Sequence, residues 1–215
     1  ALAAVGAAGP LFMALIGLTI GLSSGFSVIT GQRFGAGDEA GVRHSVAMSA
    51  MLAVGITAVL TAAAVILMPQ IMNFSAELYN DSYQYIIIIA YGIIAMMMYN
   101  LLSAICRALG DSRTPLYFLM VSSVLNVGLA LLFIRQFGWG VPGSAIALVI
   151  AQGISAVLCF GYMLKRFPML RLTRRDWVWD REFAWKHLRL GLPMAAQFTI
   201  ISLGILAIQS ICNTF

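Results

Sequence analysis

The stretch LYFLMVSSVLNVGLALLFI, which runs from Leu116 to Ile134, carries no charge and interrupts its apolar side chains with a single amide, Asn126. A helix of ~20 such residues is long enough to cross the hydrocarbon core of a bilayer. Similar runs recur along the whole chain, so we predict six transmembrane spans. The predicted spans are Pro10–Thr30, Val46–Met68, Ile86–Ile105, Leu116–Ile134, Val141–Leu164 and Gly191–Asn213.

The composition favours the same class of protein. Of the 215 residues, 61% are apolar and 10% are charged, whereas soluble domains carry ~25% charged residues. Backbone amides inside a bilayer must be paired within the protein, which leaves helices or closed barrels, and long runs without alternation favour helices. The predicted fold class is an all-α polytopic membrane protein.

Both ends of the chain resemble the interior of a longer sequence. The chain begins at Ala1, without a basic segment before the first span, and ends on ICNTF within an apolar run. A complete span normally has a polar flank at the membrane interface. We therefore expect the chain to be a fragment of a larger membrane protein.

The basic residues are distributed unevenly between the loops. All of the 13 Lys and Arg residues except Arg135 fall in the gaps after the first, third and fifth spans. Basic loops stay on the cytoplasmic side of a membrane. We therefore predict a multi-pass protein of the inner (cytoplasmic) membrane with its basic loops in the cytoplasm, and an outer loop at Asn73–Gln84, which carries Glu77 and Asp81.

The most basic segment is KRFPMLRLTRRDWVWDREFAWKHLR, residues Lys165–Arg189. Its interleaved tryptophans and its attachment to spans on both sides favour an interfacial linker that contacts anionic headgroups over a nucleic-acid site. Asp180 is a candidate N-cap of a helix within it. Gly191 and Pro193 are expected to mark where that helix meets the last span.

No group of residues indicates catalysis or metal binding. Cys106, Cys159 and Cys212 lie in or at the end of apolar runs, which is typical of small buried side chains. His44 and His187 are far apart in the sequence, and we expect both to face solvent or headgroups. No nucleophile, base and orienting group converge, so we predict neither an enzyme, nor a cofactor, nor a metal site.

Two of the basic loops share a pattern: GQRFGAGDEAG, residues Gly31–Gly41, and CRALGDSRTP, residues Cys106–Pro115. In each, Arg ends a helix, Gly supplies a left-handed turn and Asp caps the next helix. The first loop lacks the lysine of a phosphate-binding loop and follows no strand, so the hairpin interpretation is better. The residues of the pattern are Arg33, Gly35, Gly37, Asp38, Arg107, Gly110 and Asp111.

The order and spacing of four segments are similar to those of the multidrug and toxic compound extrusion (MATE) family. The segments are GQRFGAGD (31–38), AICRALGDSRTPLYF (104–118), SSVLNVGLALLFIRQFGWGVPGSAIALVIAQ (122–152) and LGLPMAAQ (190–197). The resemblance implies helices two to seven of a twelve-helix, two-lobe transporter. Residues 1–166 would form most of the N-terminal lobe, 167–190 a cytoplasmic interlobe linker with an interfacial helix, and 191–215 the first helix of the C-terminal lobe.

The resemblance also implies an activity. Members of the family are antiporters coupled to Na⁺ or H⁺ that export drugs, toxic organic cations or metabolites by alternating access. The implied partners are amphiphilic small molecules, the lipid bilayer and the remaining helices of the same chain. A lipid-linked precursor flippase would be expected to have a charged central cavity, yet no span contains Arg or Lys; a non-transporting scaffold would tolerate Asn126→Leu.

The family's coupling site is only partly present. Asn126 matches an Asn that binds the coupling cation in many members, but Ala130 and Leu148 stand where two further oxygen ligands are expected. Ile201 stands near the position of a helix-seven carboxylate in some members. None of the eight acidic residues lies inside an apolar run, so we expect the titrating group to lie outside this chain.

Neutral polar side chains remain at membrane depth. Asn126 and Gln152 are expected at comparable depth on sequential antiparallel helices, where they could share one central site. The alternative is interhelical hydrogen bonding, worth ~0.6 kcal/mol on average. The amides at membrane depth are Asn100, Asn126, Gln152, Gln197 and Gln209.

Two further features suit a transporter. Gly17, Gly21 and Gly25 repeat every fourth residue, which permits close helix approach or a sliding surface, with Pro193 as a candidate hinge. Met97 and Tyr99, within a run of three methionines and a tyrosine, would give a deformable wall for promiscuous binding, or would simply fill the core.

Overall fold

The computed structural model describes residues 2–71 and 76–212, with side chains at residues 13–66, 83–85, 87–202 and 204–205. Within these residues the chain forms six long helices and no strand. The helices are α1 (Leu2–Gly35), α2 (Glu39–Ile71), α3 (Ala76–Ala108), α4 (Arg113–Leu131), α5 (Gly140–Arg166) and α6 (Arg181–Cys212). The short turns are η1 (Leu132–Gln136), which extends α4, η2 (Pro168–Leu170) and η3 (Arg174–Asp176).

The predicted all-α membrane fold is confirmed, because the described residues of every predicted span are helical. Among the residues that the structure describes, five helices are long and apolar enough to cross a bilayer: α1 to α5, the fourth together with η1. The sixth predicted span lies within α6 as far as Cys212, and its last residue, Asn213, is outside the described part of the chain. The helices extend beyond the apolar runs because a helix pairs its own backbone groups in water as well as in lipid.

One predicted loop is largely helical. We expected Asn73–Gln84 to be an outer loop, but α3 begins at Ala76, and residues 72–75 lie outside the described part of the chain. The polar residues at the start of α3 suggested a loop to us. They are equally compatible with a helix that projects past the apolar layer, since its backbone needs no partner from a neighbouring segment.

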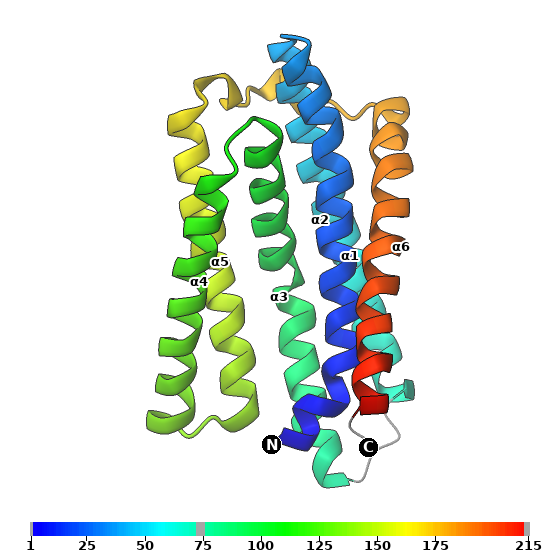
Figure 1. Cartoon of the computed structure of the whole chain (residues 1–215), viewed down its shortest axis with the longest axis vertical. Helices are drawn as coiled ribbons and strands as arrows, with labels where there is room; N and C mark the ends of the chain where they lie inside the picture. The colour runs from blue at the N-terminus through cyan, green and yellow to red at the C-terminus, as the bar shows by residue number, and fades with distance from the viewer. Residues whose placement is uncertain (1, 72–75, 213–215) are drawn as a thin grey trace.

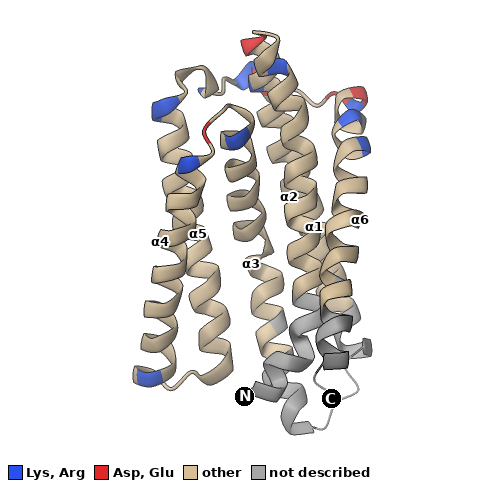
Figure 2. Ribbon diagram, viewed as in Figure 1, with Lys and Arg blue, Asp and Glu red and all other residues tan. Residues whose placement is uncertain are grey.

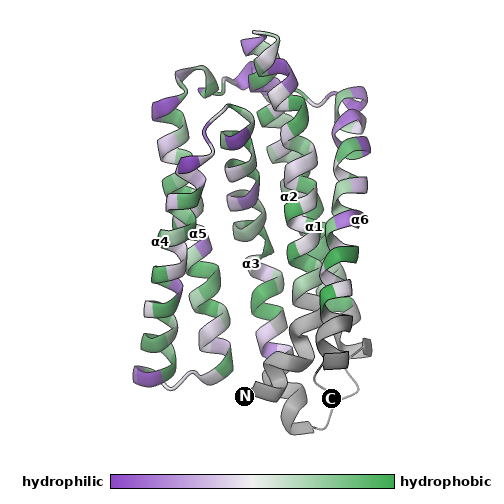
Figure 3. Ribbon diagram, in the orientation of Figure 1, coloured by the Kyte–Doolittle hydropathy of each residue, from purple (hydrophilic) through white to green (hydrophobic). Residues whose placement is uncertain are grey.

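The helices form a bundle with α3 in the middle (Figure 1). Helix α3 packs against α1 and α2 on one side and against α5 on the other, while α4 packs mainly on α5 and α6 mainly on α1. Helix α4 is the least covered, with only Pro115 and Ser122 buried along it. Most of its other residues are exposed or half-buried, and many of them are apolar, as the green residues along it in Figure 3 show.

Charged residues gather at one end of the bundle (Figure 2). That end carries the α1–α2 connection, the α3–α4 connection and the segment between α5 and α6. Arg135, in η1, lies at the opposite end. The separation predicted from the sequence is therefore present in the fold, and it follows from the alternating direction of consecutive helices.

The predicted helix caps at this end are confirmed. Asp38 Oδ1 accepts a hydrogen bond from Gly41 N at 2.8 Å, and Asp38 pairs with Arg33 at 3.0 Å. The turn between them needs glycine, because Gly37 has a φ of 73°. Asp180 Oδ1 likewise accepts from the backbone of Glu182 at 2.9 Å.

The loop between α3 and α4 repeats this glycine turn and aspartate cap, and it adds a contact with α5. Asp111 accepts hydrogen bonds from Thr114 N at 3.1 Å and Thr114 Oγ1 at 2.7 Å, after Gly110 with a φ of 89°. Tyr162 of α5 donates to the same carboxylate at 3.0 Å. Burial raises the pKa of Asp111, but these hydrogen bonds outweigh burial and hold the pKa below its usual value.

The glycines of α1 lie against α6. A Cβ built on Gly21 would lie 2.6 Å from Met194 O, and one built on Gly25 would lie 2.7 Å from Gly191 N. Both are backbone atoms that cannot rotate away. The two helices therefore pack backbone against backbone, which a bilayer favours because van der Waals contact replaces the missing hydrophobic force.

Helix α6 is continuous through the predicted linker boundary. We expected an interfacial helix and a separate last span that meet near Gly191 and Pro193, but both residues lie inside α6. Proline removes one backbone donor without necessarily ending a helix when neighbouring helices hold the segment in place. Here Gly191 is buried against Phe26 of α1, so the packing favours a single helix.

His187 corrects another prediction. We expected it to face solvent or headgroups, yet it is completely buried between α6, α1 and α2. Its Nδ1 lies 2.9 Å from Phe183 O, which only accepts, so Nδ1 carries the proton. Nε2 then accepts from Ser45 Oγ at 3.1 Å, and Ser45 in turn accepts from Thr30 Oγ1 at 2.9 Å. This relay of hydrogen bonds ties α6 to α2 and α1.

The close α1–α6 contact predicts a position-specific effect of a single methyl group. Gly21→Ala or Gly25→Ala in the full-length protein should lower the free energy of unfolding by ~1–3 kcal/mol, since the added Cβ meets fixed backbone. The thermal unfolding midpoint of the purified protein in detergent would report it. Gly55→Ala is the matched control, because a Cβ there meets nothing within 4 Å. Equal stability of Gly21→Ala and Gly55→Ala would contradict the contact.

Burial of neutral His187 predicts a dependence of stability on pH. Burial lowers the pKa of His187 from its ordinary 6.5, so below that pH the unfolded chain binds a proton that the folded chain refuses. Stability should therefore fall as the pH drops below ~6.5, and the histidine should contribute no such dependence well above it. Thermal unfolding between about pH 7.5 and about pH 5.5 would measure this loss.

The matched pair for this measurement is His187→Gln and His44→Gln. The first removes the buried titrating ring and should flatten the acid side of the profile, whereas the second leaves His187 in place and should keep it. An unchanged acid-side slope in His187→Gln would show that another group causes the loss.

Candidate functional site

The polar side chains at membrane depth differ in whether they have partners. Asn100 Nδ2 on α3 donates to Thr19 Oγ1 on α1 at 3.4 Å, and Thr19 itself donates to Ile16 O at 2.9 Å. Asn100 is half-buried. Its amide thus joins two helices, which is the structural role that the sequence analysis left open.

Met97 and Tyr99 lie in the packed core. Met97 is 1% and Tyr99 4% exposed, and both belong to the main cluster of buried side chains. Tyr99 donates to Pro115 O at 2.9 Å, and Ser23 of α1 donates to the Met97 sulfur at 3.5 Å. In this arrangement they join α3 to α4 and α1, and their predicted contact with a substrate stays a prediction.

Helix α5 carries two buried polar atoms without partners. Gln152 Oε1 and Ser155 Oγ are both shielded from solvent, and neither has a hydrogen-bond partner among the described residues. They are three residues apart, which places them on one face of the helix. An unpaired buried oxygen costs about 1–3 kcal/mol, so a structure that keeps two of them together has two acceptors available for a ligand or another helix.

Ser155 was missed in the sequence analysis. A serine inside an apolar helix can satisfy its hydroxyl on the preceding turn, so it attracts no attention by itself. The signal that could have found it is its spacing from Gln152, because residues i and i+3 share a helix face. Gln152 and Ser155 together form the α5 polar pair.

Asn126 lies half-buried on α4. No hydrogen bond joins it to Gln152 in the part of the chain that the structure describes. Ala130 is also half-buried, and Leu148 packs against the cluster of Tyr85, Ile89, Val141 and Ala145 between α3 and α5. The position of Leu148 in that cluster accounts for an apolar side chain where an oxygen ligand was expected.

The polar residues of α6 do not join this group. Gln197 is exposed, while the Thr199 hydroxyl on the same helix is buried and without a partner among the described residues. The side chain of Gln209 lies outside the described residues. The site predicted from sequence therefore stays a prediction, and its candidates among the described residues are Asn126 and Gln152, to which the structure adds Ser155.

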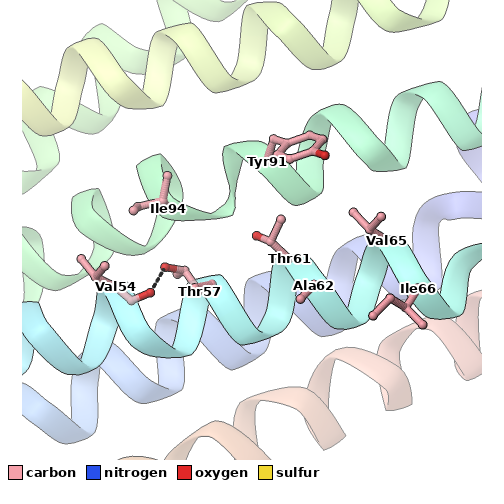
Figure 4. A pocket seen from close by; sticks show the side chains of 9 residues that line it. Val54, Thr57, Thr61, Ala62, Val65, Ile66, Tyr91 and Ile94 are labelled. Carbon is pink, nitrogen blue, oxygen red and sulfur yellow. Dashed lines mark hydrogen bonds between the residues drawn. The ribbon is translucent and has the colours of Figure 1, made fainter.

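An apolar hollow of about 530 Å³ lies elsewhere, between α2 and α3 (Figure 4). Thr57 and Thr61 are its hydroxyl residues, and both bond to backbone: Thr57 to Ala53 O at 2.8 Å and Thr61 to Ala90 O at 2.8 Å. The hollow offers no unpaired polar atom of these two residues. None of the predicted substrate-site residues lines it.

The chemistry available in the middle of the bundle is that of neutral oxygens. Charged side chains of the described helices lie towards their ends (Figure 2), so amide and hydroxyl oxygens are the polar groups at depth. Such oxygens accept hydrogen bonds from a protonated amine or contribute to the coordination of a hard cation. They bring no charge of their own, so they cannot neutralise a bound cation.

Comparisons with known proteins agree in both sequence and structure. The family model named MatE matches residues 1–132. The "Probable multidrug resistance protein YoeA" of Bacillus subtilis is 33% identical across 100% of this chain and 49% of its own length. The "Probable multidrug resistance protein NorM" of Thermotoga maritima is 28% identical across 98% of this chain and 47% of its own.

Two solved structures of a multidrug resistance MATE family transporter of the MOP superfamily match the fold. The inward-facing conformation gives a TM-score of 0.85 at 27% identity over 94% of this chain, and the outward-facing one gives 0.87 at 27% identity over 99%. Each match covers 48% of the solved chain. The chain thus spans about half the length of the relatives it matches, and it belongs to the MatE family.

Proposed function

We propose that the full protein is a secondary exporter of amphiphilic drugs, organic cations or metabolites, driven by inward Na⁺ or H⁺ and working by alternating access. This chain supplies one half of it. The proposal includes no enzymatic step, because export needs only binding and a change of access. The printed names of the relatives support drug efflux as the class of activity.

The observation that carries the proposal is that the fold of this chain is similar to two conformations of a transporter. The same six helices match an inward-facing and an outward-facing transporter almost equally well, with TM-scores of 0.85 and 0.87. A unit that keeps its internal packing in both states can move as one body against the other half. The packing of α3 against α1, α2 and α5 supports this for the helices of the first lobe, since closely packed helices resist sliding past one another.

Within the proposal, this half contributes a neutral lining. Asn126 and the α5 polar pair would hold the polar part of a substrate or part of the coordination of the coupling cation. The carboxylate that changes charge during the cycle would come from helices outside this chain, because none of the predicted spans contains one. The coupling ion is Na⁺ or H⁺, and the transport measurement below distinguishes them.

The proposed orientation places the charged end of the bundle in the cytoplasm of a multi-pass protein of the cytoplasmic membrane. Twelve of the thirteen basic residues lie at that end, and Arg135 alone at the other. The positive-inside rule supports this direction. Substrates would then be captured from the side of the α1–α2 connection and released on the side of η1.

Transport by the full-length protein tests the function directly. Efflux of a fluorescent organic cation from proteoliposomes, with Na⁺ and H⁺ gradients imposed separately, should be driven by one of them. Asn126→Leu and Gln152→Leu should each lower the driven rate roughly tenfold, the loss expected for one hydrogen bond. Gln152→Leu should also raise the thermal unfolding midpoint, because it removes an unpaired buried oxygen.

Val127→Leu is the control for this test, since Val127 is exposed on α4 beside Asn126 and its change should leave transport intact. Gradient-driven transport that survives both amide substitutions would still support an exporter, but it would show that Asn126 and Gln152 do not contribute to its binding site. The absence of transport under either gradient, beside an active control transporter, would contradict the proposal and direct attention to lipid-linked substrates.

Labelling from outside the cell tests the orientation. In a full-length variant without its native cysteines, Phe137→Cys should react with a membrane-impermeant maleimide in intact cells. Glu39→Cys should react only after the cells are lysed, although both residues are exposed. The reverse pattern would show that the basic end faces outward.

A further inference from the structure

A second hollow, of about 710 Å³, lies at the charged end of the bundle. It is formed where α5 ends, where α2 begins and along the segment that leaves α5. The lining residues are Glu39, Arg43, Arg166, Phe167, Pro168, Met169, Arg171 and Thr173. This set of residues, called here the basic hollow, belongs neither to the neutral amides at membrane depth nor to the apolar hollow between α2 and α3.

The basic hollow has a surplus of positive charge. It contains three arginines and one glutamate. Among the ion pairs of the described residues, none involves Arg166 or Arg171, so their guanidinium groups are not paired with a carboxylate. Unpaired guanidinium groups converging on one hollow favour an anion, and their planar geometry suits the two oxygens of a phosphate.

The nearby carboxylate of Asp176 is already occupied. Thr173 donates to Asp176 Oδ2 from its backbone N at 2.6 Å and from Oγ1 at 2.7 Å, and Arg43 Nε lies 3.6 Å from Oδ1. The hydrogen bonds from Thr173 hold the pKa of Asp176 below its usual value. Asp176 therefore stays ionised to fix Arg43 and the loop, and it is not free to neutralise the other two arginines.

The floor of the hollow is apolar. Phe167, Pro168 and Met169 line it, and the Arg166 guanidinium lies 5.9 Å from the centroid of the Phe167 ring. Helix α5, a candidate membrane span, ends at Arg166. The hollow thus lies at the depth of lipid headgroups, with charge and apolar surface side by side.

We infer that the basic hollow binds the headgroup of an anionic phospholipid. Its phosphate would lie on Arg166 and Arg171, and its glycerol and first acyl carbons against Phe167, Pro168 and Met169. A free phosphate would use the arginines but would leave the apolar floor uncovered. Basic pockets at the end of transmembrane helices recognise lipid headgroups through this combination.

A chain of side-chain contacts joins the basic hollow to α6. Arg43, which lines it, pairs with Asp176, and the Asp176 carbonyl lies 3.2 Å from His44 Nδ1. His44 stacks on Phe183 of α6 with ring centroids 4.9 Å apart. A bound lipid would therefore hold the segment between α5 and α6 in place. The inference does not depend on what the protein transports.

Native mass spectrometry of the delipidated full-length protein tests the site. The protein in detergent is titrated with phosphatidylglycerol and, separately, with phosphatidylcholine of the same acyl chains, and the bound fraction is measured. The wild type should retain phosphatidylglycerol preferentially. Arg166→Gln with Arg171→Gln should weaken its binding roughly 25-fold, because each basic contact to an anionic lipid changes affinity about fivefold.

Arg174→Gln with Arg175→Gln is the matched control, since it removes the same charge from the same segment but from residues that do not line the hollow. It should change binding by no more than about twofold. Equal losses in both double variants would replace the site by a diffuse basic surface, and equal retention of the two lipids by the wild type would overturn the inference. If the double variant Arg166→Gln with Arg171→Gln is not monodisperse, the binding of phosphatidylglycerol to the single variant Arg171→Gln is compared with that of the wild type instead.

Inorganic phosphate distinguishes the two sources of the anion. Excess phosphate should compete only weakly with phosphatidylglycerol and should not by itself raise the thermal unfolding midpoint. Complete displacement of the lipid, with the same stabilisation by phosphate alone, would assign the hollow to a soluble anion instead.

Discussion

Every backbone N–H and C=O inside a bilayer must be hydrogen-bonded within the protein, and the rest of this structure depends on that constraint. It accounts for six long helices and for connections confined to the ends of the bundle. It also explains how the helices meet. Because lipid already satisfies apolar side chains, helices associate through close contact, and α1 and α6 achieve it where Gly21 and Gly25 bring two backbones together.

The same constraint moves charge and polar chemistry to the ends. At the basic end, carboxylates cap helices, Tyr162 binds Asp111 across two elements, and Arg43 pairs with Asp176. The buried His187 relay is part of this end: it joins α6, which in the family frame begins the second lobe, to two helices of the first. Contacts of this kind hold the segment between α5 and α6 against α2.

In the middle of the bundle some polar side chains are paired, as Asn100 is with Thr19, but others are not. Gln152 Oε1 and Ser155 Oγ have no partner among the described residues, and α4, which carries Asn126, is barely covered. The relatives are about twice as long as this chain. Unpaired acceptors beside an uncovered helix are consistent with a half that is completed by a substrate, a cation or the remaining helices.

The sequence by itself determined the helical class, the approximate spans, the separation of charge and the caps at Asp38, Asp111 and Asp180, because these depend on hydropathy and on hydrogen bonds between residues close in the chain. Only the tertiary structure decided that His187 is buried, that α6 continues through Pro193 and that the side-chain oxygens of Gln152 and Ser155 are buried without a partner among the described residues. The reason is physical. Local sequence sets the backbone of a helix, whereas burial depends on which distant helix covers each face, and Ser45 and His187, which bond to each other, are 142 residues apart.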